Sequence, residues 1–145
     1  MTTTYRVATA QDVPAVKDLT DVMLAHTGLG VATPEKLHSL ITNPAGVWIL
    51  AEQDGKAIGF VSGIIHETMF NNERRVSDMG WFVLPEYRGG FTARRLMTLL
   101  EQWAKLQGIK QIWFGQTTGD DIESVVKYYK RSGYTIKGFN AVKEL

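Results

Sequence analysis

The sequence has 145 residues and no cysteine, and this absence excludes several kinds of chemistry together. Disulfides, thiolate nucleophiles and zinc sites built on cysteine are all ruled out. The three histidines, His26, His38 and His66, are far apart and lack the spacing of metal ligands, so we expect no metal site. With no disulfides and no recognisable export signal, the default expectation is a cytoplasmic protein.

Long apolar runs and an excess of one charge are also missing. Apolar stretches such as 57–65 are too short and too interrupted by glycine to cross a bilayer, and we expect no membrane association. Sixteen basic residues nearly balance 15 acidic ones, so bulk electrostatics give no reason to expect a nucleic-acid partner. With 44% hydrophobic and 21% charged residues, the composition is that of a folded protein, and we expect one domain over 1–145.

Periodicity and turn residues predict the elements of this domain in the order βααβββαβαβ. The expected strands are 5–8, 47–52, 57–70, 75–84, 111–115 and 135–142. The expected helices are one from near Val13 to near His26, 33–42, a long helix after Gly90 that Gly108 ends, and 122–131, which Asp120 and Asp121 can cap.

Together these elements predict a mixed α/β fold. The strands between 47 and 84 form an antiparallel meander, with Asp54-Gly55 as a hairpin turn. A βαβ unit then places 111–115 parallel to 75–84, and Gly80 marks a bulge or a close backbone approach. The expected architecture is a mostly antiparallel sheet of six to seven strands with helices on both faces.

One stretch organises the rest of the chain: the strand end at 83–84, a turn at Pro85, Gly89-Gly90, and then the long helix. Glycines allow backbone to approach a ligand closely. The helix directs unpaired amides and its positive dipole end at the same loop. The stretch therefore predicts a seat for a phosphate or pyrophosphate.

The element order and the segment Val83-x-Pro85-Glu86-Tyr87-Arg88-Gly89-Gly90 resemble the GNAT superfamily of N-acetyltransferases over nearly the whole chain. The loop of that family reads Arg or Gln, two residues, Gly, one residue, and Gly or Ala. Here Arg88 and Ala93 fit the first and last positions. The resemblance implies an acetyl-CoA site formed by Phe82, Val83, Leu84, Arg88, Gly89, Gly90, Phe91, Thr92, Ala93 and Arg94.

The fourth position of the loop departs from this pattern, because Phe91 stands where a glycine is usual. A Cβ atom there could crowd a diphosphate or prevent a positive φ. The adjacent Gly90 is then the residue expected to take over the permissive role.

A second similarity lies near the end of the chain, where a tyrosine precedes a Gly-aromatic pair by four residues. The tyrosine carried over is Tyr129, before Gly133-Tyr134, and in the family this phenol often donates a proton to the departing CoA thiolate. The alternative is that Tyr128 and Tyr129 only cover the core. The asparagine and alanine that the family often has on this helix are not reproduced at Ile122 and Val125.

The resemblance implies direct attack of an amine on the acetyl thioester, without a covalent enzyme intermediate. A backbone amide from 82–84 would stabilise the thioester oxygen. The candidates for the base are Glu67 and Asp78, ranked equal, with His66 behind them. His66 and Glu67 point to opposite faces of their strand, so they cannot both serve. Each could instead be a solvated or salt-bridged strand residue near Arg74 and Arg75.

The acceptor would be a primary amine of a small molecule or protein, and its identity is not written in the sequence. The loop 27–31, Met69-Phe70 and Trp81 are expected to line its site, or to be ordinary core or dimer contacts. Their apolar character argues mildly against a polycationic acceptor. The alternative function is a GNAT-fold module that binds acyl-CoA or a protein partner without turnover. Pairing of two copies through the last strands is compatible with the sequence but required by no residue.

Overall fold

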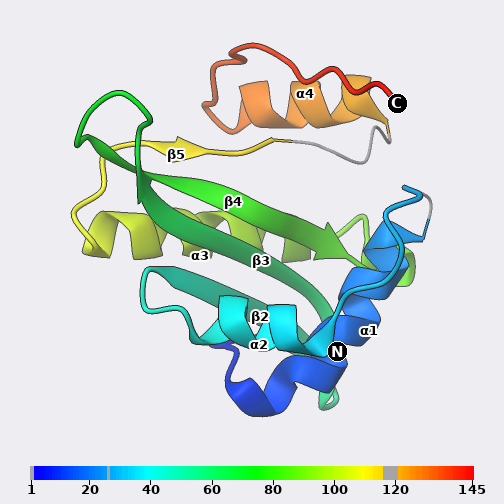
Figure 1. Cartoon of the computed structure of the whole chain (residues 1–145). Helices are drawn as coiled ribbons and strands as arrows, with labels where there is room; N and C mark the ends of the chain where they lie inside the picture. The colour runs from blue at the N-terminus through cyan, green and yellow to red at the C-terminus, as the bar shows by residue number, and fades with distance from the viewer. Residues whose placement is uncertain (1, 26, 116–120) are drawn as a thin grey trace. The chain divides into compact units, whose positions relative to one another are not determined.

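A computed structural model describes residues 2–25, 27–115 and 121–145. His26, where we expected the first helix to end, and Asp120, a proposed helix cap, lie outside these residues. The chain divides into two compact units, Met1–Phe114 and Gly115–Leu145, which Figure 1 colours from blue to yellow and from yellow to red.

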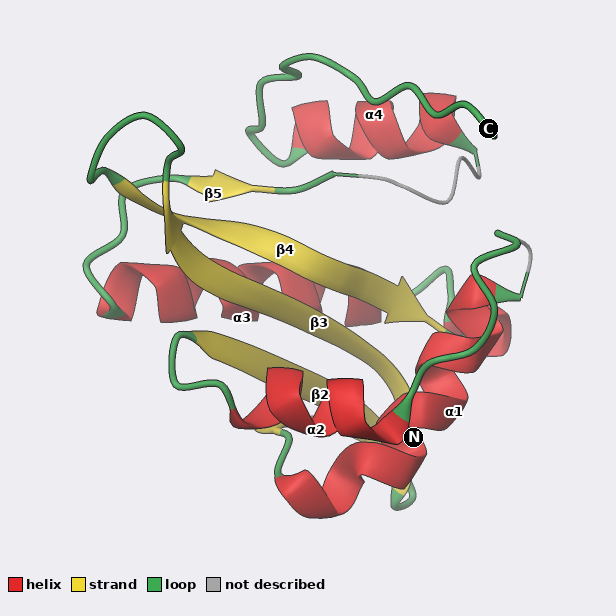
Figure 2. Cartoon of the chain, viewed as in Figure 1, coloured by secondary structure: helices red, strands yellow, loops and turns green. Residues whose placement is uncertain are grey.

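The first unit contains one sheet of five strands in the order β1-β2-β3-β4-β5 (Figure 2). The strands are β1 (Thr4–Val7), β2 (Gly46–Gln53), β3 (Lys56–Glu67), β4 (Arg74–Val83) and β5 (Ile112–Trp113). The first four strands are antiparallel neighbours, and β5 runs parallel to β4. The predicted meander and the predicted parallel pair are therefore confirmed, although β5 is shorter than the expected 111–115.

Helices cover both faces of this sheet, as predicted. They are α1 (Val13–Leu24) and α2 (Pro34–Thr42) on one face and α3 (Thr92–Leu106) on the other (Figure 1). Alternate residues of β2 feed two separate cores, because successive strand side chains point to opposite faces. Val47 and Ile49 pack with Leu96 and Leu100 of α3, whereas Trp48 stacks on Phe60 in the core beneath α1 and α2.

Strand β4 contains a bulge where Gly80 predicted one. Gly63 pairs with Asp78 and Ser62 pairs with Gly80, so Met79 is an extra residue. A Cβ atom on Gly80 would lie 2.8 Å from Cε2 of Phe60, which is too close for a carbon-carbon contact. The residue before the bulge thus faces α3, while Gly80 faces the opposite core.

A charged cluster fastens the start of the chain to the sheet. Arg6 Nη2 lies 2.7 Å from Oδ1 of Asp12, and Arg6 Nε lies 2.7 Å from Oε1 of Glu52. The hydrogen bond from Arg6 lowers the pKa of Asp12 to about 2, with a further bond from the Thr9 amide. This cluster joins β1, the 3₁₀ turn that precedes α1, and β2.

The second unit contains α4 (Ile122–Arg131), as predicted. The expected strand over 135–142 is wrong, since these residues form neither helix nor strand. Phe139 and Val142 are 94% and 92% exposed, and Gly138 has a φ of +75°. The segment therefore buries no apolar face that would stabilise a strand. The five strands of the described residues replace the expected six to seven, and pairing of two copies through a last strand loses its basis.

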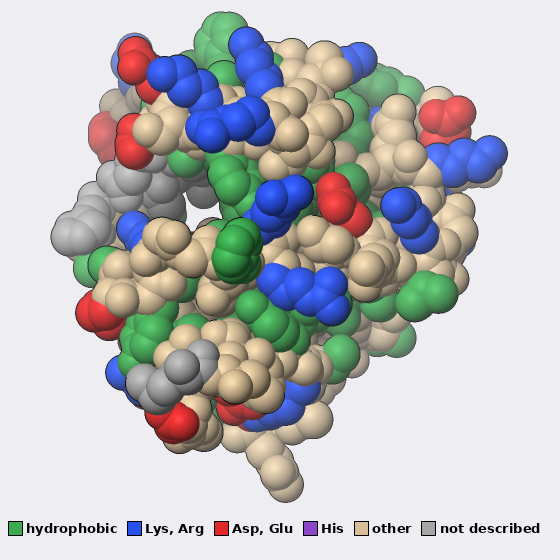
Figure 3. Space-filling model, turned by 180° about the vertical axis from the view of Figure 1, so that it is seen from behind, with side chains coloured by type: hydrophobic (Ala, Val, Ile, Leu, Met, Phe, Trp, Pro, Cys, Tyr) green, Lys and Arg blue, Asp and Glu red, His purple; other side chains and the backbone are tan. Residues whose placement is uncertain are grey.

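The surface matches the balanced charge of the sequence. Basic and acidic side chains are mixed on the face seen from behind in Figure 3. In the described part of the chain, no helix is both long and apolar enough to span a membrane.

Candidate active site

The loop that follows β4 has the geometry of an anion-binding turn. After the 3₁₀ turn Pro85–Tyr87, Gly89 adopts a φ of +92°, a conformation that side chains other than glycine rarely adopt. Phe91 has a φ of −97°, and its side chain is 81% exposed. The left-handed residue is thus Gly89, and the expectation that Gly90 would take this role is wrong. Phe91 needs no positive φ, so its backbone conformation does not require a glycine at this position.

The first amides of α3 are oriented toward this loop. Arg95 donates the first bond of the helix, to the carbonyl of Phe91 at 2.8 Å. The amides of Thr92, Ala93 and Arg94 come before it, in the first turn, where no carbonyl one turn earlier in the helix can accept them. Phe91 is the N-cap residue and has no side-chain oxygen to accept them either. The helix dipole adds positive potential at the same place, so the site suits an anion.

Space for a ligand is present at the two glycines. A Cβ atom built on Gly89 or on Gly90 would have no heavy atom within 4 Å. Backbone at these residues is therefore accessible from outside. A diphosphate fits this arrangement, because several backbone amides can contact it without a side chain in between.

Arg88 fastens the loop to the end of β4. Its Nε atom donates to the carbonyl of Val83 at 2.7 Å, and its guanidinium carbon lies 5.2 Å from the ring centre of Phe82. Arg88 is an exposed residue. Arg88 thus holds the glycine loop in place and still offers donors to an anion.

Only one amide of the expected strand end is directed away from β3. Leu84 donates its amide to the carbonyl of Ile58 at 2.8 Å. In an antiparallel pair the amides alternate in direction, so Phe82 also faces β3 and Val83 faces the other edge. Of the three expected residues, Val83 is therefore the one whose amide faces away from β3.

The pairing of β5 with β4 covers only the first part of β4. It consists of Val76 with Ile112 and Ser77 with Trp113, whereas β4 continues to Val83. Beyond the paired part, Trp81 packs edge-on against Phe114 at 5.5 Å and donates its indole N–H to the carbonyl of Ala93 at 2.9 Å. Trp81 therefore has the contacts of a core residue.

The two expected bases lie on the same face of the sheet but not together. Asp78 is half-buried and pairs with Gly63, whose face is that of Leu100 on α3. Glu67 is exposed and pairs with Arg74 at the far end of β3. Arg74 and Asp78 are four positions apart along β4, a distance of about 13 Å. Asp78 is adjacent to the bulge, whereas Glu67 is remote from it.

His66 lies on the opposite face, as its alternation with Glu67 requires. Its Nε2 atom is 2.7 Å from the hydroxyl of Ser77, and its Nδ1 atom is 3.0 Å from the carbonyl of Glu67. We did not anticipate Ser77 from the sequence. A cross-strand pair of this kind depends on the register of two strands, and no local motif indicates it.

Tyr129 belongs to the second unit, where its side chain is 7% exposed. Its hydroxyl donates to the carbonyl of Gly115 at 3.3 Å, and its ring lies 5.7 Å from that of Tyr134. The Gly-aromatic pair thus folds back onto the tyrosine that it marks in the sequence. Burial suits a packing role, and the hydroxyl also retains a proton that it can donate.

Comparison with known proteins now decides the family. Residues 18–134 match the acetyltransferase (GNAT) family. The chain belongs to this family. No protein with a curated description matches it. The prediction of an N-acetyltransferase is confirmed at the level of the family.

Solved structures show the same fold at low identity. Ribosomal-protein-alanine N-acetyltransferase from Brucella melitensis biovar Abortus 2308 has a TM-score of 0.79 at 16% identity, with 100% of both chains covered. AAC(6')-Iy, solved with the bisubstrate analogue CoA-S-monomethyl-acetylneamine, has a TM-score of 0.79 at 18% identity over 100% of this chain and 99% of that one. An aminoglycoside acetyltransferase from an uncultured soil metagenomic sample has a TM-score of 0.79 at 12% identity over 99% and 96%.

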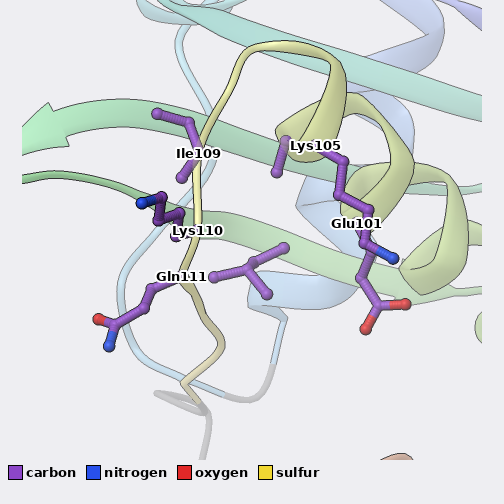
Figure 4. A pocket seen from close by; sticks show the side chains of 7 residues that line it. Glu101, Lys105, Ile109, Lys110 and Gln111 are labelled. Carbon is purple, nitrogen blue, oxygen red and sulfur yellow. The ribbon is translucent and has the colours of Figure 1, made fainter.

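A separate hollow of about 160 Å³ lies at the other end of α3. Figure 4 shows the side chains around it, with Glu101 and Lys105 on the helix and Ile109, Lys110 and Gln111 on the segment leading into β5. About 20 Å of helix separates Lys105 from the first turn of α3. This hollow is therefore not part of the GNAT loop.

Proposed function

We propose that this GNAT protein transfers an acetyl group from acetyl-CoA directly to a primary amine of a small molecule or protein. The observation that carries the proposal is the loop in which Gly89 adopts a left-handed φ ahead of the first-turn amides of α3. Membership of the acetyltransferase family supports the use of acetyl-CoA. We place the protein in the cytoplasm. Because its basic and acidic residues are nearly equal in number, we propose neither a nucleic acid nor a membrane as its partner.

In this proposal the acetyl-CoA site is built mostly from backbone. Arg88 and the amides of the segment from Gly89 through Arg94 hold the diphosphate, with Phe91 contributing its backbone. Val83 donates its amide to the thioester oxygen at the edge of β4, between Phe82 and Leu84, whose amides face β3. Acetyl-CoA supplies the activated acyl group. The protein supplies orientation and hydrogen bonds to the charge that develops during attack.

Asp78 is our proposed base, and its surroundings support it over Glu67. A base must come within reach of the attacking amine, directly or through one water molecule. Asp78 is half-buried beside the bulge of β4, whereas Glu67 is exposed opposite Arg74. We therefore keep Glu67 as the second candidate. On this assignment Asp78 takes the proton that the ammonium group of the acceptor must lose.

Tyr129 is our proposed acid. Its hydroxyl now donates to the carbonyl of Gly115, and we propose that it gives its proton to the sulfur of the departing CoA. A phenol has an ordinary pKa of about 10, close enough to that of a thiol for this transfer. The alternative role of Tyr129 in covering the core remains compatible with its burial.

Calorimetry with acetyl-CoA tests the premise, and thiol release across an amine panel tests the reaction. We expect Asp78→Asn and Tyr129→Phe each to lower kcat by about 100-fold while acetyl-CoA affinity stays the same. Glu67→Gln is the matched control for Asp78→Asn and should retain activity. An unchanged rate in Tyr129→Phe would remove that residue from the mechanism, and no binding at millimolar acetyl-CoA would overturn the proposed function.

The alternative, a module that binds acyl-CoA or a protein without turnover, rested partly on Phe91. The φ of −97° at Phe91 weakens that ground, since the backbone there has a conformation that any residue can adopt. Acetyl-CoA binding without thiol release for any amine would favour this alternative.

A further inference from the structure

Four side chains form a cluster at the start of β4, on the face opposite α3. We call it the β4-start cluster: His66, Arg75, Ser77 and Trp113. His66 pairs with Arg75, and Ser77 pairs with Trp113. Side-chain contacts link them further, since His66 Nε2 lies 2.7 Å from Ser77 Oγ and the Arg75 guanidinium carbon lies 4.5 Å from the Trp113 ring centre. The cluster thus spans three adjacent strands.

The guanidinium of Arg75 is held in place, and it forms no ion pair with any residue that the structure describes. Its Nε atom is buried and has no hydrogen-bond partner among the described residues. Stacking on Trp113 fixes the guanidinium plane, and the Trp113 N–H is itself bonded to Oε1 of Gln111 at 3.2 Å. A buried donor without a partner is costly. Because Nε is buried, an anion would be received at the two terminal amino groups of this guanidinium.

The acidic side chains of β3 and β4 near the cluster, Glu67 and Asp78, lie on the other face of the sheet. Glu67 pairs with Arg74, and Asp78 pairs with Gly63 on the side of α3. Strand alternation therefore leaves Arg75 and His66 as the titratable groups that the β4-start cluster presents. The surface offers positive charge, a hydroxyl group and an indole face.

The cluster lies where β4 stops pairing with β5. Pairing ends at Ser77 and Trp113, and the amide proposed to contact the thioester is that of Val83. The Arg75 guanidinium contacts the ring of Trp113, the partner of Ser77. Five positions of β3 separate the partners of Ser77 and Val83, which corresponds to about 16 Å. About five residues of extended peptide span this distance.

We propose that the β4-start cluster recognises an acidic residue of a peptide acceptor, about five residues from the amine that is acetylated. This inference rests on the proposed function, and it specifies the class of acceptor. Arg75 forms the charged hydrogen bonds to the acceptor carboxylate, and Trp113 flanks it. Polycationic acceptors are disfavoured, because Arg75 repels them. The protein therefore differs in acceptor class from aminoglycoside acetyltransferases that share its fold.

The test uses six-residue peptides with a free N-terminal amine that differ only at position five, which is Asp, Asn or Lys. For the native protein with acetyl-CoA, we expect kcat/KM for the Asp peptide to exceed that for the Asn peptide by about tenfold. Arg75→Gln should abolish this preference. Arg74→Gln is the matched control, because it removes a neighbouring charge on the opposite face and should keep the preference.

An equal or greater rate with the Lys peptide, or an Asp preference that survives Arg75→Gln, would overturn the inference. A second measurement does not depend on turnover: calorimetry with the N-acetylated Asp peptide, which cannot react. The native protein should bind it about tenfold more tightly than Arg75→Gln does. Equal affinity or no binding would overturn the inference even in an active enzyme. A protein that binds this peptide but not acetyl-CoA would instead overturn the proposed function alone.

Discussion

The two sites that we propose at the two ends of strand β4 are of different kinds. Beyond its end, from Arg88 to Arg94, the proposed acetyl-CoA site is made of backbone amides and a left-handed glycine. At its start, the β4-start cluster is made of side chains whose backbone is ordinary strand. A backbone site tolerates changes of side chain but not changes of chain conformation. A site made of side chains is instead sensitive to changes of those side chains. Different substitutions should therefore weaken binding at the two ends of β4.

The largest effect, a loss of folding stability, is expected at the bulge of β4, which lies between the two sites. Gly80→Val should lower the free energy of unfolding by about 2–3 kcal/mol, since the new side chain would meet the Phe60 ring. Chemical denaturation measures this change. Gly90→Ala is the control for stability and should stay within about 0.5 kcal/mol, because no atom lies near its Cβ position. Equal stability of the two variants would show that the bulge adapts to a side chain.

The next effect separates the backbone site from the side-chain site. Gly89→Val should weaken acetyl-CoA binding by about tenfold or more, because a β-branched residue does not adopt a φ of +92° and the loop must move. Calorimetry measures the Kd. Gly55→Val places similar strain in the β2–β3 turn, at a φ of +75°, and should leave the Kd unchanged. If both variants weaken binding equally, general destabilisation is responsible rather than the loop.

A smaller effect is expected from the hydroxyl of the β4-start cluster. Ser77→Ala removes the contact with His66 and should cost about 0.5–1 kcal/mol of stability, and it should weaken binding of the acidic peptide less than Arg75→Gln does. Thr42→Ala removes a hydroxyl bond on α2, to the carbonyl of His38, and should leave peptide affinity unchanged. Acetyl-CoA affinity should not respond to Ser77→Ala, and a loss there would contradict the separation of the two ends.

The smallest effect is the loss of stability at low pH, which should affect the sites at both ends of β4 equally because it concerns the whole fold. The pKa of Asp12 is lowered from 3.8 to about 2 by its bond with Arg6. Its stabilising contribution is therefore complete above pH 3.8 and is lost as the pH falls through 2. The free energy of unfolding of Asp12→Asn should depend less steeply on pH over this range than that of the native protein. Parallel curves would show that other carboxylates cause the acid response.

The elements of the first unit could be predicted from the sequence because their signals are local. Asp54-Gly55 predicted the β2–β3 turn, Gly108 the end of α3, and Gly80 the bulge, and the structure confirms each of them. The segment 135–142 also alternates locally, but a strand needs a neighbour and a buried face. Its exposed apolar side chains show that alternation alone does not provide these.

The site could be predicted only in part, for a related reason. The residues of the glycine loop and of the helix start that follows it are contiguous in the chain, so a local sequence motif predicted them together. The role of Gly89 rather than Gly90 was not, since the choice of the left-handed residue depends on how the strand end, the turn and the helix start are joined. The arrangement of Arg75, Ser77 and Trp113 depends on strand register and on a bulge, which no local pattern specifies.

The sequence by itself determined the order of the elements through α4, the absence of cysteine chemistry, and the stretch from Val83 to Leu96 as the centre of the chain. Each follows from composition or from residues close along the chain. The tertiary structure decided which amide of β4 faces outward, which side chains share a face, and that Asp78 rather than Glu67 adjoins the bulge. These depend on pairing between strands, because one extra residue at Met79 changes the face of every β4 side chain that follows it.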